Sequence, residues 1–394
     1  MNSAWRNVAL LSACQAMLLS TNSTLIAING LAGLELAPYR SLATLPVTFY
    51  VLGAALTTMP ASLYMRRVGR RPGLMQSTAF AVAGALVCAT AIRLQSFWLL
   101  CAGALLFGGF NAFGQYYRFA AVDVAQPELR ASAISLVLAG GLAGGIIGPT
   151  TSRATIDLLG PKFLGAYLAL IVFALVTLAL LAFIRIPKAL EHTRAPSGRP
   201  LREIVAQPKY IVAAMGAAIG YGVMNFLMTS TPIAMGVCGH PYKAAAFVIS
   251  SHVVGMYLPS FFAGRIIRRL GVLRVMLAGA ALNLGSIAIA LSGIAVPYFW
   301  SSLVLLGVGW NFLYIGGTTL LTETYRPEEM AKAQGANDFI IFAMQVLSSF
   351  SSGVVVTNAG WKQVNLSALS PVILVIVAIV WLGLRERAAR AAAA

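Results

Sequence analysis

Apolar stretches of about twenty residues alternate along this chain with short polar segments. A helix needs about 20 predominantly apolar residues to cross the hydrocarbon core of a bilayer. The pattern therefore predicts twelve membrane-spanning helices, at residues 8–30, 42–64, 75–93, 97–117, 131–152, 163–184, 210–230, 244–263, 275–294, 298–318, 335–357 and 367–384. Only 10% of the residues are charged and 59% are apolar, whereas about a quarter of the residues of a soluble domain are charged. We therefore expect an all-α membrane protein.

The longest polar stretch, residues 186–208, contains four prolines and divides the chain into two parts. We expect an N-terminal six-helix half at 1–185, a cytoplasmic linker at 186–208 and a C-terminal six-helix half at 209–394. The halves repeat each other, since Leu106-Phe-Gly-Gly-Phe-Asn111 corresponds to Leu306-Gly-Val-Gly-Trp-Asn311 at a constant offset. Parallel repeats of this kind are typical of secondary transporters whose substrate site lies between the halves, near the bilayer midplane.

Basic residues are concentrated in alternate loops, and the formal net charge is +17. Cytoplasmic loops of membrane proteins carry the excess of Lys and Arg, so both termini are predicted to be cytoplasmic. We expect a multi-pass protein of the bacterial inner (cytoplasmic) membrane, in which the basic excess faces the anionic headgroups of the lipid bilayer. No nucleic-acid partner is expected, because the sequence lacks a basic groove interleaved with stacking aromatic residues.

Two motifs resemble the major facilitator superfamily. The basic segment from Ser62 to Arg71 is similar to the short loop after the second span of that superfamily, and Gly140 to Pro149 is similar to its glycine-rich fifth span. The resemblance implies the major facilitator fold, a monomer, and a carrier rather than an enzyme. Ser62 and Arg66 stand where the family has a glycine and an acidic residue, which leaves the usual charge pairing of this loop open.

The charged residues at the predicted cytoplasmic ends of the spans form a candidate gate. Arg66 or Arg67 would pair with Asp123 in the first half, and a corresponding pair would form in the second half. Such pairs would close the cytoplasmic end in the outward-open state and break when the halves rock. The alternative is that these residues are ordinary solvated charges of the cytoplasmic face. The complete candidate set is Arg66, Arg67, Asp123, Arg268, Arg269, Glu323 and Asp338.

Soft metal ligands recur at helical spacing in the seventh and eighth predicted spans. Met224 and Met228 are four residues apart, as are His252 and Met256, so each pair lies on one face of its helix. Thioether sulfur and imidazole nitrogen together suit a monovalent copper ion, and a histidine inside an apolar span usually marks function. The alternative is that the methionines fill gaps between packed helices.

Three more soft donors, Met235, Cys238 and His240, follow in what is predicted to be an outer loop. They would line an access route for the ion, or they would be ordinary loop residues.

The two Met and His pairs resemble the signature of the CcoA-like copper importers. That resemblance implies Met224 and His252 as principal ligands, assisted by Met228 and Met256, and copper import into the cytoplasm for cytochrome oxidase assembly. Copper would be the cargo, and no cofactor is expected. The sequence offers no HExxH motif and no nucleophile with a nearby base, so a membrane enzyme is not predicted.

A small organic solute is the alternative cargo. The chain is also similar to the RfnT-like branch of the family, which is associated with riboflavin. Polar and aromatic residues within the spans suit a flat heterocycle, with Asn111, Gln115, Asn311 and Tyr314 as the candidate lining. A drug or metabolite antiporter is a third interpretation, because a glycine-rich fifth span is common in antiporters.

Overall fold

A computed structural model describes residues 3–124, 130–184, 198–326 and 329–393, and every regular element in them is a helix. The expectation of an all-α protein is therefore confirmed. The elements are α1 (Ser3–Leu36), η1 (Arg40–Leu42), α2 (Leu45–Val68), α3 (Arg70–Arg93), α4 (Phe97–Gly114), α5 (Tyr117–Val124), α6 (Arg130–Thr155), α7 (Leu164–Ala182), α8 (Leu201–Val205), α9 (Pro208–Val237), α10 (Tyr242–Tyr257), α11 (Ser260–Leu270), α12 (Val272–Ser292), α13 (Val296–Thr322) and α14 (Met330–Ala393).

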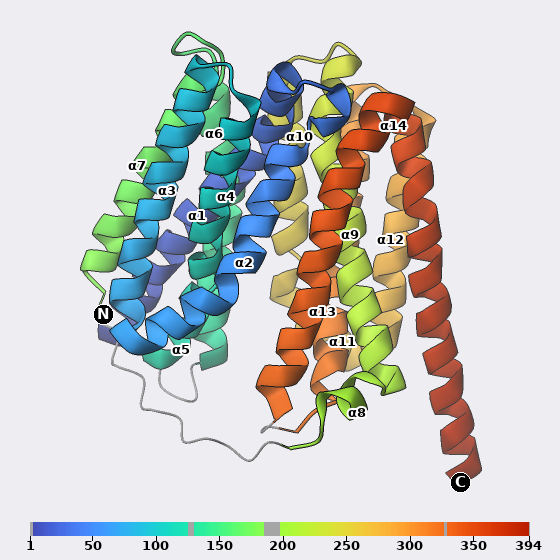
Figure 1. The fold of residues 1–394 in the computed structure, drawn as a ribbon. Helices are drawn as coiled ribbons and strands as arrows, with labels where there is room; N and C mark the ends of the chain where they lie inside the picture. The colour runs from blue at the N-terminus through green and yellow to red at the C-terminus, as the bar shows by residue number, and fades with distance from the viewer. Residues whose placement is uncertain (1–2, 125–129, 185–197, 327–328, 394) are drawn as a thin grey trace.

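The long helices are consistent with the twelve predicted spans. Within the described residues, nine helices are long and apolar enough to cross a membrane, and α10 with α11, bent by 43°, would form a tenth span. Helix α6, which corresponds to the predicted span at 131–152, is 26 residues long. Helix α14 runs for 64 residues but reverses direction at Gly360, whose φ is 76° (Figure 1), so it supplies two spans.

The repeat in the sequence is also a repeat in the backbone. Gly69 joins α2 to α3 with a φ of 97°, and Gly271 joins α11 to α12 with a φ of 86°. Each glycine follows an Arg-Arg pair and one aliphatic residue. Only glycine adopts these angles without a steric penalty, which explains why both halves turn sharply at the same point.

Two hydrophobic cores lie in two bundles of helices (Figure 1). The first core is built from residues between Val8 and Ile184. The second is built from residues between Ile204 and Leu382 together with Ala43, which follows η1. The predicted boundary at 185/186 lies outside the described residues and stays a prediction.

Hydrogen bonds join the two bundles where α2 and α10 begin, and Figure 1 shows both helix starts at the end remote from the chain termini. The Thr44 hydroxyl donates to the Ser349 carbonyl at 2.7 Å, and the Thr48 and Ser349 hydroxyls bond at 3.2 Å. The Ser152 and Tyr242 hydroxyls bond at 2.7 Å across α6 and α10. Helices α2 with α14, and α6 with α10, therefore close this end of the interface.

Candidate functional site

Three aromatic rings from the second half stack into one cluster. Trp310 and Tyr314 are four residues apart and therefore lie on one face of α13. Their rings are stacked with centroids 5.1 Å apart and planes 8° apart. Tyr221 of α9 meets both rings edge-on, at 5.2 Å from Trp310 and 5.5 Å from Tyr314.

Tyr257 and Tyr50 extend this aromatic cluster toward the first half. Tyr257 ends α10, directly before the bend at Leu258 and Pro259, and its ring centroid is 6.1 Å from that of Trp310. Tyr50 of α2 lies near Tyr221 and Tyr257. Because Tyr50 comes from the other bundle, the cluster borders the interface between the halves. Tyr221, Tyr257 and Tyr314 are only partly buried, so their rings keep accessible surface.

One basic and one acidic side chain, from different halves, also lie near this cluster. Arg118 of α5 hydrogen-bonds the Tyr314 hydroxyl and acts electrostatically on Asp338 of α14. The Asn337 amide donates to the Asp338 carboxylate at 3.4 Å. Phe342, one turn after Asp338, packs against the core of the first half, so this part of α14 faces the interface.

Buried polar atoms beside the cluster have no protein partner within the described residues. They include the Trp310 indole N–H and the side-chain oxygens of Asn337 and Asn311. Buried polar groups in native proteins are normally hydrogen-bonded. One donor and two acceptors next to stacked rings are suited to a flat ligand with a polar edge.

Two of the four predicted lining residues lie on α13 at or beside the cluster. Tyr314 is a member of it. The Asn311 amide donates to the Met256 carbonyl and the Ser260 hydroxyl, both at 2.7 Å, so it ties α13 to the α10–α11 bend.

The other two predicted lining residues lie on and just after α4. The Asn111 side-chain oxygen accepts hydrogen bonds from Asn22 at 2.9 Å and from Gln115 at 3.3 Å. Asn111 and Gln115 therefore belong to a polar network with α1, and a substrate-lining role for them stays a prediction.

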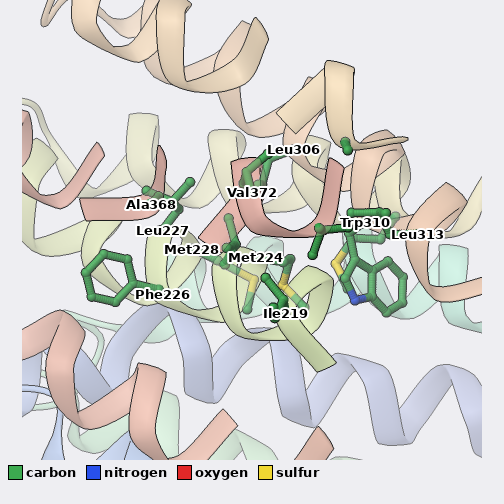
Figure 2. Packing of buried hydrophobic residues seen from close by; sticks show 14 of the residues in the cluster. Ile219, Met224, Phe226, Leu227, Met228, Leu306, Trp310, Leu313, Ala368 and Val372 are labelled. Carbon is green, nitrogen blue, oxygen red and sulfur yellow. The ribbon is translucent and has the colours of Figure 1, made fainter. Parts of the chain in front are cut away.

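The four predicted metal ligands lie within the packing of the second half. Met224, Met228 and Met256 are 2%, 3% and 6% exposed and belong to its hydrophobic core. Figure 2 shows Met224 and Met228 among apolar side chains of that core, including Leu227 and Leu306. These thioethers fill space between helices, as methionine commonly does.

His252 bonds to the neighbouring helix of the same half. Its Nδ1 lies 2.6 Å from the Leu303 carbonyl, and since a carbonyl only accepts, Nδ1 carries the proton. The helices are close here, because a Cβ placed on Gly307 would come within 2.7 Å of the His252 carbonyl oxygen. The His252 side chain is fully buried, and its Nε2 has no partner within the described residues.

The three predicted access-route ligands lie at the end of α9 and just beyond it. Met235 lies inside α9 and is fully buried, so its placement in a loop is wrong. His240 bonds to the Ile294 carbonyl at 2.7 Å through Nε2 and meets Phe299 edge-on. Cys238 follows the last residue of α9 and is partly buried against the second core.

The predicted gate residues lie at several places. Glu323 pairs with Lys209 at 2.8 Å, and Asp338 lies with Arg118 in the interface. Arg268 and Arg269 lie in the last turn of α11. Arg67 is exposed. The side chains of Arg66 and Asp123 lie outside the described part of the chain. The gate was predicted for the state closed at the cytoplasmic end, so it stays a prediction.

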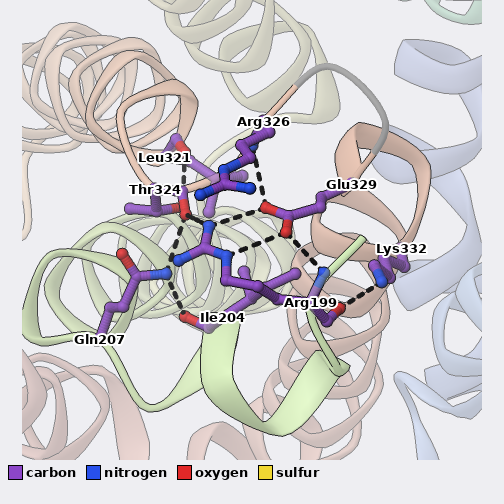
Figure 3. Close-up of polar contacts among 8 residues, drawn as sticks. All are labelled: Arg199, Ile204, Gln207, Leu321, Thr324, Arg326, Glu329 and Lys332. Atoms are coloured by element: carbon purple, nitrogen blue, oxygen red, sulfur yellow. Dashed lines mark hydrogen bonds and ion pairs between the residues drawn. The ribbon is translucent and has the colours of Figure 1, made fainter. Parts of the chain in front are cut away.

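A polar cluster that was not predicted joins the end of the linker to the second half (Figure 3). Arg199 Nη2 lies 2.7 Å from the buried Glu329 carboxylate, and Arg199 Nε donates to the same carboxylate at 2.9 Å. The Arg326 backbone N–H adds a bond at 3.0 Å, and Lys332 donates to the Arg199 carbonyl. The Arg199 side chain, followed by the Arg326 N–H, holds the pKa of Glu329 well below its usual range.

The aromatic cluster was largely missed because its members are far apart in sequence. Tyr221 and Tyr257 flank the Met and His pairs but were not weighed as ligand contacts. The spacing of Trp310 and Tyr314 was the available signal, because it places two large rings on one helix face. No local pattern indicates that Arg118 reaches Tyr314 across the interface.

Comparison with known proteins gives a family match that extends over both bundles. The model described as Major Facilitator Superfamily matches residues 8–349 and 239–394. A full-length relative, "Riboflavin transporter RfnT" of Brucella anthropi, is 39% identical over 99% of this chain and 98% of its own length. "Uncharacterized MFS-type transporter YddS" of Bacillus subtilis is 27% identical over 90% of this chain and 86% of its own length.

Solved structures show the same fold. A bacterial homologue of the human lysosomal transporter Spinster, in an inward-facing and unoccupied conformation, superposes with a TM-score of 0.72. It covers 98% of both chains at 13% sequence identity. The occupied inward-facing conformation gives a TM-score of 0.71 at 16% identity and covers 96% of both chains.

The prediction of copper import is wrong. The relative with 39% identity along its full length is named for riboflavin, not for a metal. The physical reason for the error is that spacing of Met and His along two helices does not show which way the side chains face. Met224, Met228 and Met256 pack inside the second half, and His252 bonds to α13, whereas a transported ion must be reached from the interface between the halves.

Proposed function

Because this chain belongs to the Major Facilitator Superfamily and is a multi-pass membrane transporter rather than an enzyme, we propose that its cargo is riboflavin. The observation that carries the proposal is the 39% identity to "Riboflavin transporter RfnT", which runs through 99% of this chain. Uptake into the cytoplasm across the bacterial inner membrane is the direction we propose, with both termini cytoplasmic. The resemblance to the RfnT-like branch predicts the same cargo.

The aromatic cluster supports this cargo chemically. The isoalloxazine ring of riboflavin is flat, with carbonyl oxygens and an N–H along one edge. Aromatic rings bind such a face by offset stacking or edge contacts at centroid distances of about 4.5–7 Å, and Tyr221, Trp310 and Tyr314 already meet one another in this range. The Trp310 indole N–H and the Asn337 side-chain oxygen are buried without a partner within the described residues, and they would bond to the polar edge of the ring.

Access to the cluster would alternate between the two membrane faces. The hydroxyl bonds of Thr48 with Ser349 and of Ser152 with Tyr242 close the end remote from the termini. Rocking of one bundle against the other would break these bonds and expose the aromatic cluster at that end, as in other transporters built from two repeats. The substrate would bind where residues of both halves meet, so its binding is coupled to the rocking.

The test is riboflavin uptake in a bacterial strain that can neither make nor import riboflavin. Expression of this chain should restore growth on low external riboflavin and give saturable uptake of radiolabelled riboflavin, and Trp310→Leu should weaken both. Membrane expression of each variant is measured in parallel. Absence of uptake by the wild-type chain, when it is present in the membrane, would overturn the proposal.

A further inference from the structure

A cavity of about 570 Å³ lies between helices of the second half, where α9 and α12 begin and α13 and α14 end. Figure 1 shows the start of α9 and the end of α14 at the end of the bundle that carries the chain termini. Every described residue that lines this cavity belongs to the second half, and none of them is a member of the aromatic cluster. The cavity is therefore separate from the site proposed for riboflavin.

The lining of the cavity changes from apolar to charged at the predicted ends of the spans. Leu277 and Val380 lie inside two predicted spans, whereas Arg274 and Arg387 lie just outside them. Val380 and Leu384 are 43% and 59% exposed, so the cavity opens onto the surface of the bundle. Because a span ends where the hydrocarbon core of the bilayer gives way to the headgroups, the cavity extends across that boundary.

The charged part of the lining contains three basic and two acidic side chains within the described residues. Lys209 lies 2.8 Å from the carboxylate of Glu323 and 3.3 Å from that of Glu386, so one lysine is bound to both acidic groups. Arg274 and Arg387 are exposed, and neither forms an ion pair within the described part of the chain. These two arginines therefore supply the positive charge at the rim of the cavity.

We propose that this cavity binds an anionic phospholipid of the cytoplasmic leaflet. Its phosphate would lie at Arg274 and Arg387, and its acyl chains would continue along Leu277 and Val380 into the hydrocarbon core. A guanidinium group forms paired hydrogen bonds with phosphate oxygens, and basic pockets between membrane helices on the cytoplasmic side bind acidic headgroups. A lipid is favoured over a soluble anion because the charged rim is continuous with an apolar lining that opens onto the surface of the bundle.

The two arginines should determine the preference for an anionic headgroup. Each basic residue beside an anionic membrane surface changes affinity about fivefold, so Arg274→Gln combined with Arg387→Gln should weaken lipid binding about 25-fold. Arg385→Gln is the matched control. Arg385 is an exposed arginine near the end of the same helix, but it lies over the Trp381 ring at 5.6 Å and does not line the cavity. Its replacement should leave lipid binding close to that of the wild type.

Gly383 allows the space to be tested without a change of charge. A Cβ placed on Gly383 would lie 3.8 Å from Leu273 Cδ1, and both residues line the cavity. This distance is an ordinary van der Waals contact, so α14 should accept a larger side chain there. Gly383→Leu would fill part of the cavity and should weaken lipid binding with both arginines in place.

The experiment is native mass spectrometry of the purified full-length chain in detergent, titrated with dioleoylphosphatidylglycerol or with dioleoylphosphatidylcholine. The wild type should retain one phosphatidylglycerol about tenfold more tightly than phosphatidylcholine, because the two lipids share their acyl chains and differ in headgroup charge. Soluble glycerol 1-phosphate, added in excess, should not displace the bound lipid. The same titration is run on the double arginine variant, Arg385→Gln and Gly383→Leu.

Equal binding of the two lipids by the wild type would overturn the proposal. An equal loss of binding in the double arginine variant and in Arg385→Gln would do the same, as would full binding by Gly383→Leu. Displacement of the lipid by glycerol 1-phosphate would show a site for soluble anions instead. If the double variant does not fold, the comparison of lipids on the wild type and Gly383→Leu still decide. None of these measurements uses riboflavin, so their result does not depend on the proposed function.

Discussion

Replacing Trp310 by Phe tests whether the aromatic cluster binds substrate. Trp310 is 4% exposed, is stacked on Tyr314 at 5.1 Å and meets Tyr221 and Tyr257 edge-on. Phenylalanine keeps an aromatic ring in the core but removes the indole N–H and part of the stacking surface. A lost hydrogen bond costs about 0.5–1.5 kcal/mol, and reduced aromatic contact costs about 0.5–1.5 kcal/mol. Together they predict a riboflavin dissociation constant raised roughly 5-fold to 160-fold.

The assay is flavin fluorescence quenching by the purified chain, with Trp361→Phe as the matched control. Trp361 is also a buried tryptophan of the second half, 8% exposed, with an indole N–H that has no partner within the described residues. Its ring centroid lies 5.0 Å from that of Phe299, and within the described residues neither ring pairs with a ring of the aromatic cluster. Trp361→Phe should therefore leave the riboflavin affinity unchanged. Equal effects of the two substitutions, or none from Trp310→Phe, would refute the assignment of the site.

Three further outcomes follow from the geometry. The hydroxyls of Thr48 and Ser349 are 3.2 Å apart, so cysteines at these two positions should cross-link under oxidation and stop riboflavin uptake. A reductant should restore uptake. Unimpaired uptake by the cross-linked protein would exclude alternating access through this end. Met224→Leu, a volume-conserving change in the core, should cost less than about 1.5 kcal/mol of stability and leave riboflavin affinity unchanged, and a large loss of affinity would place Met224 in the site. Because the pKa of Glu329 is lowered in the folded state, its pair with Arg199 contributes stability above the unfolded pKa of about 4.3, and this stability is lost as the pH falls from there through the lowered pKa. Glu329→Gln should therefore lower the melting temperature at pH 7 and have little effect at the lowest pH tolerated. An equal effect at both pH values would contradict the pairing.

The alternation of long apolar and short polar stretches was enough to predict the helical spans. Each predicted span has a helical counterpart, and the repeated Arg-Arg segments before Gly69 and Gly271 became matching turns. These features are local, because about twenty apolar residues or one glycine angle specify them without knowledge of the partners. The boundaries differ mainly where helices extend beyond the apolar segment, as α9 does to Val237.

The cargo could not be read from spacing, because spacing fixes a helix face but not what that face contacts. Met224 and Met228 share a face of α9, and the structure shows that this face lies in the core of the second half. The residues that do border the interface, Tyr50, Arg118 and Trp310, lie far apart in sequence and meet only through packing of α2, α5 and α13. A pattern of soft ligands was therefore visible in the sequence, whereas most members of the aromatic cluster were not.

The most direct test of the account is uptake of radiolabelled riboflavin by proteoliposomes containing only this chain, with radiocopper measured in the same preparation. The account predicts saturable riboflavin uptake that Trp310→Leu weakens, and copper uptake no greater than in liposomes without protein. Copper accumulation without riboflavin uptake would contradict it.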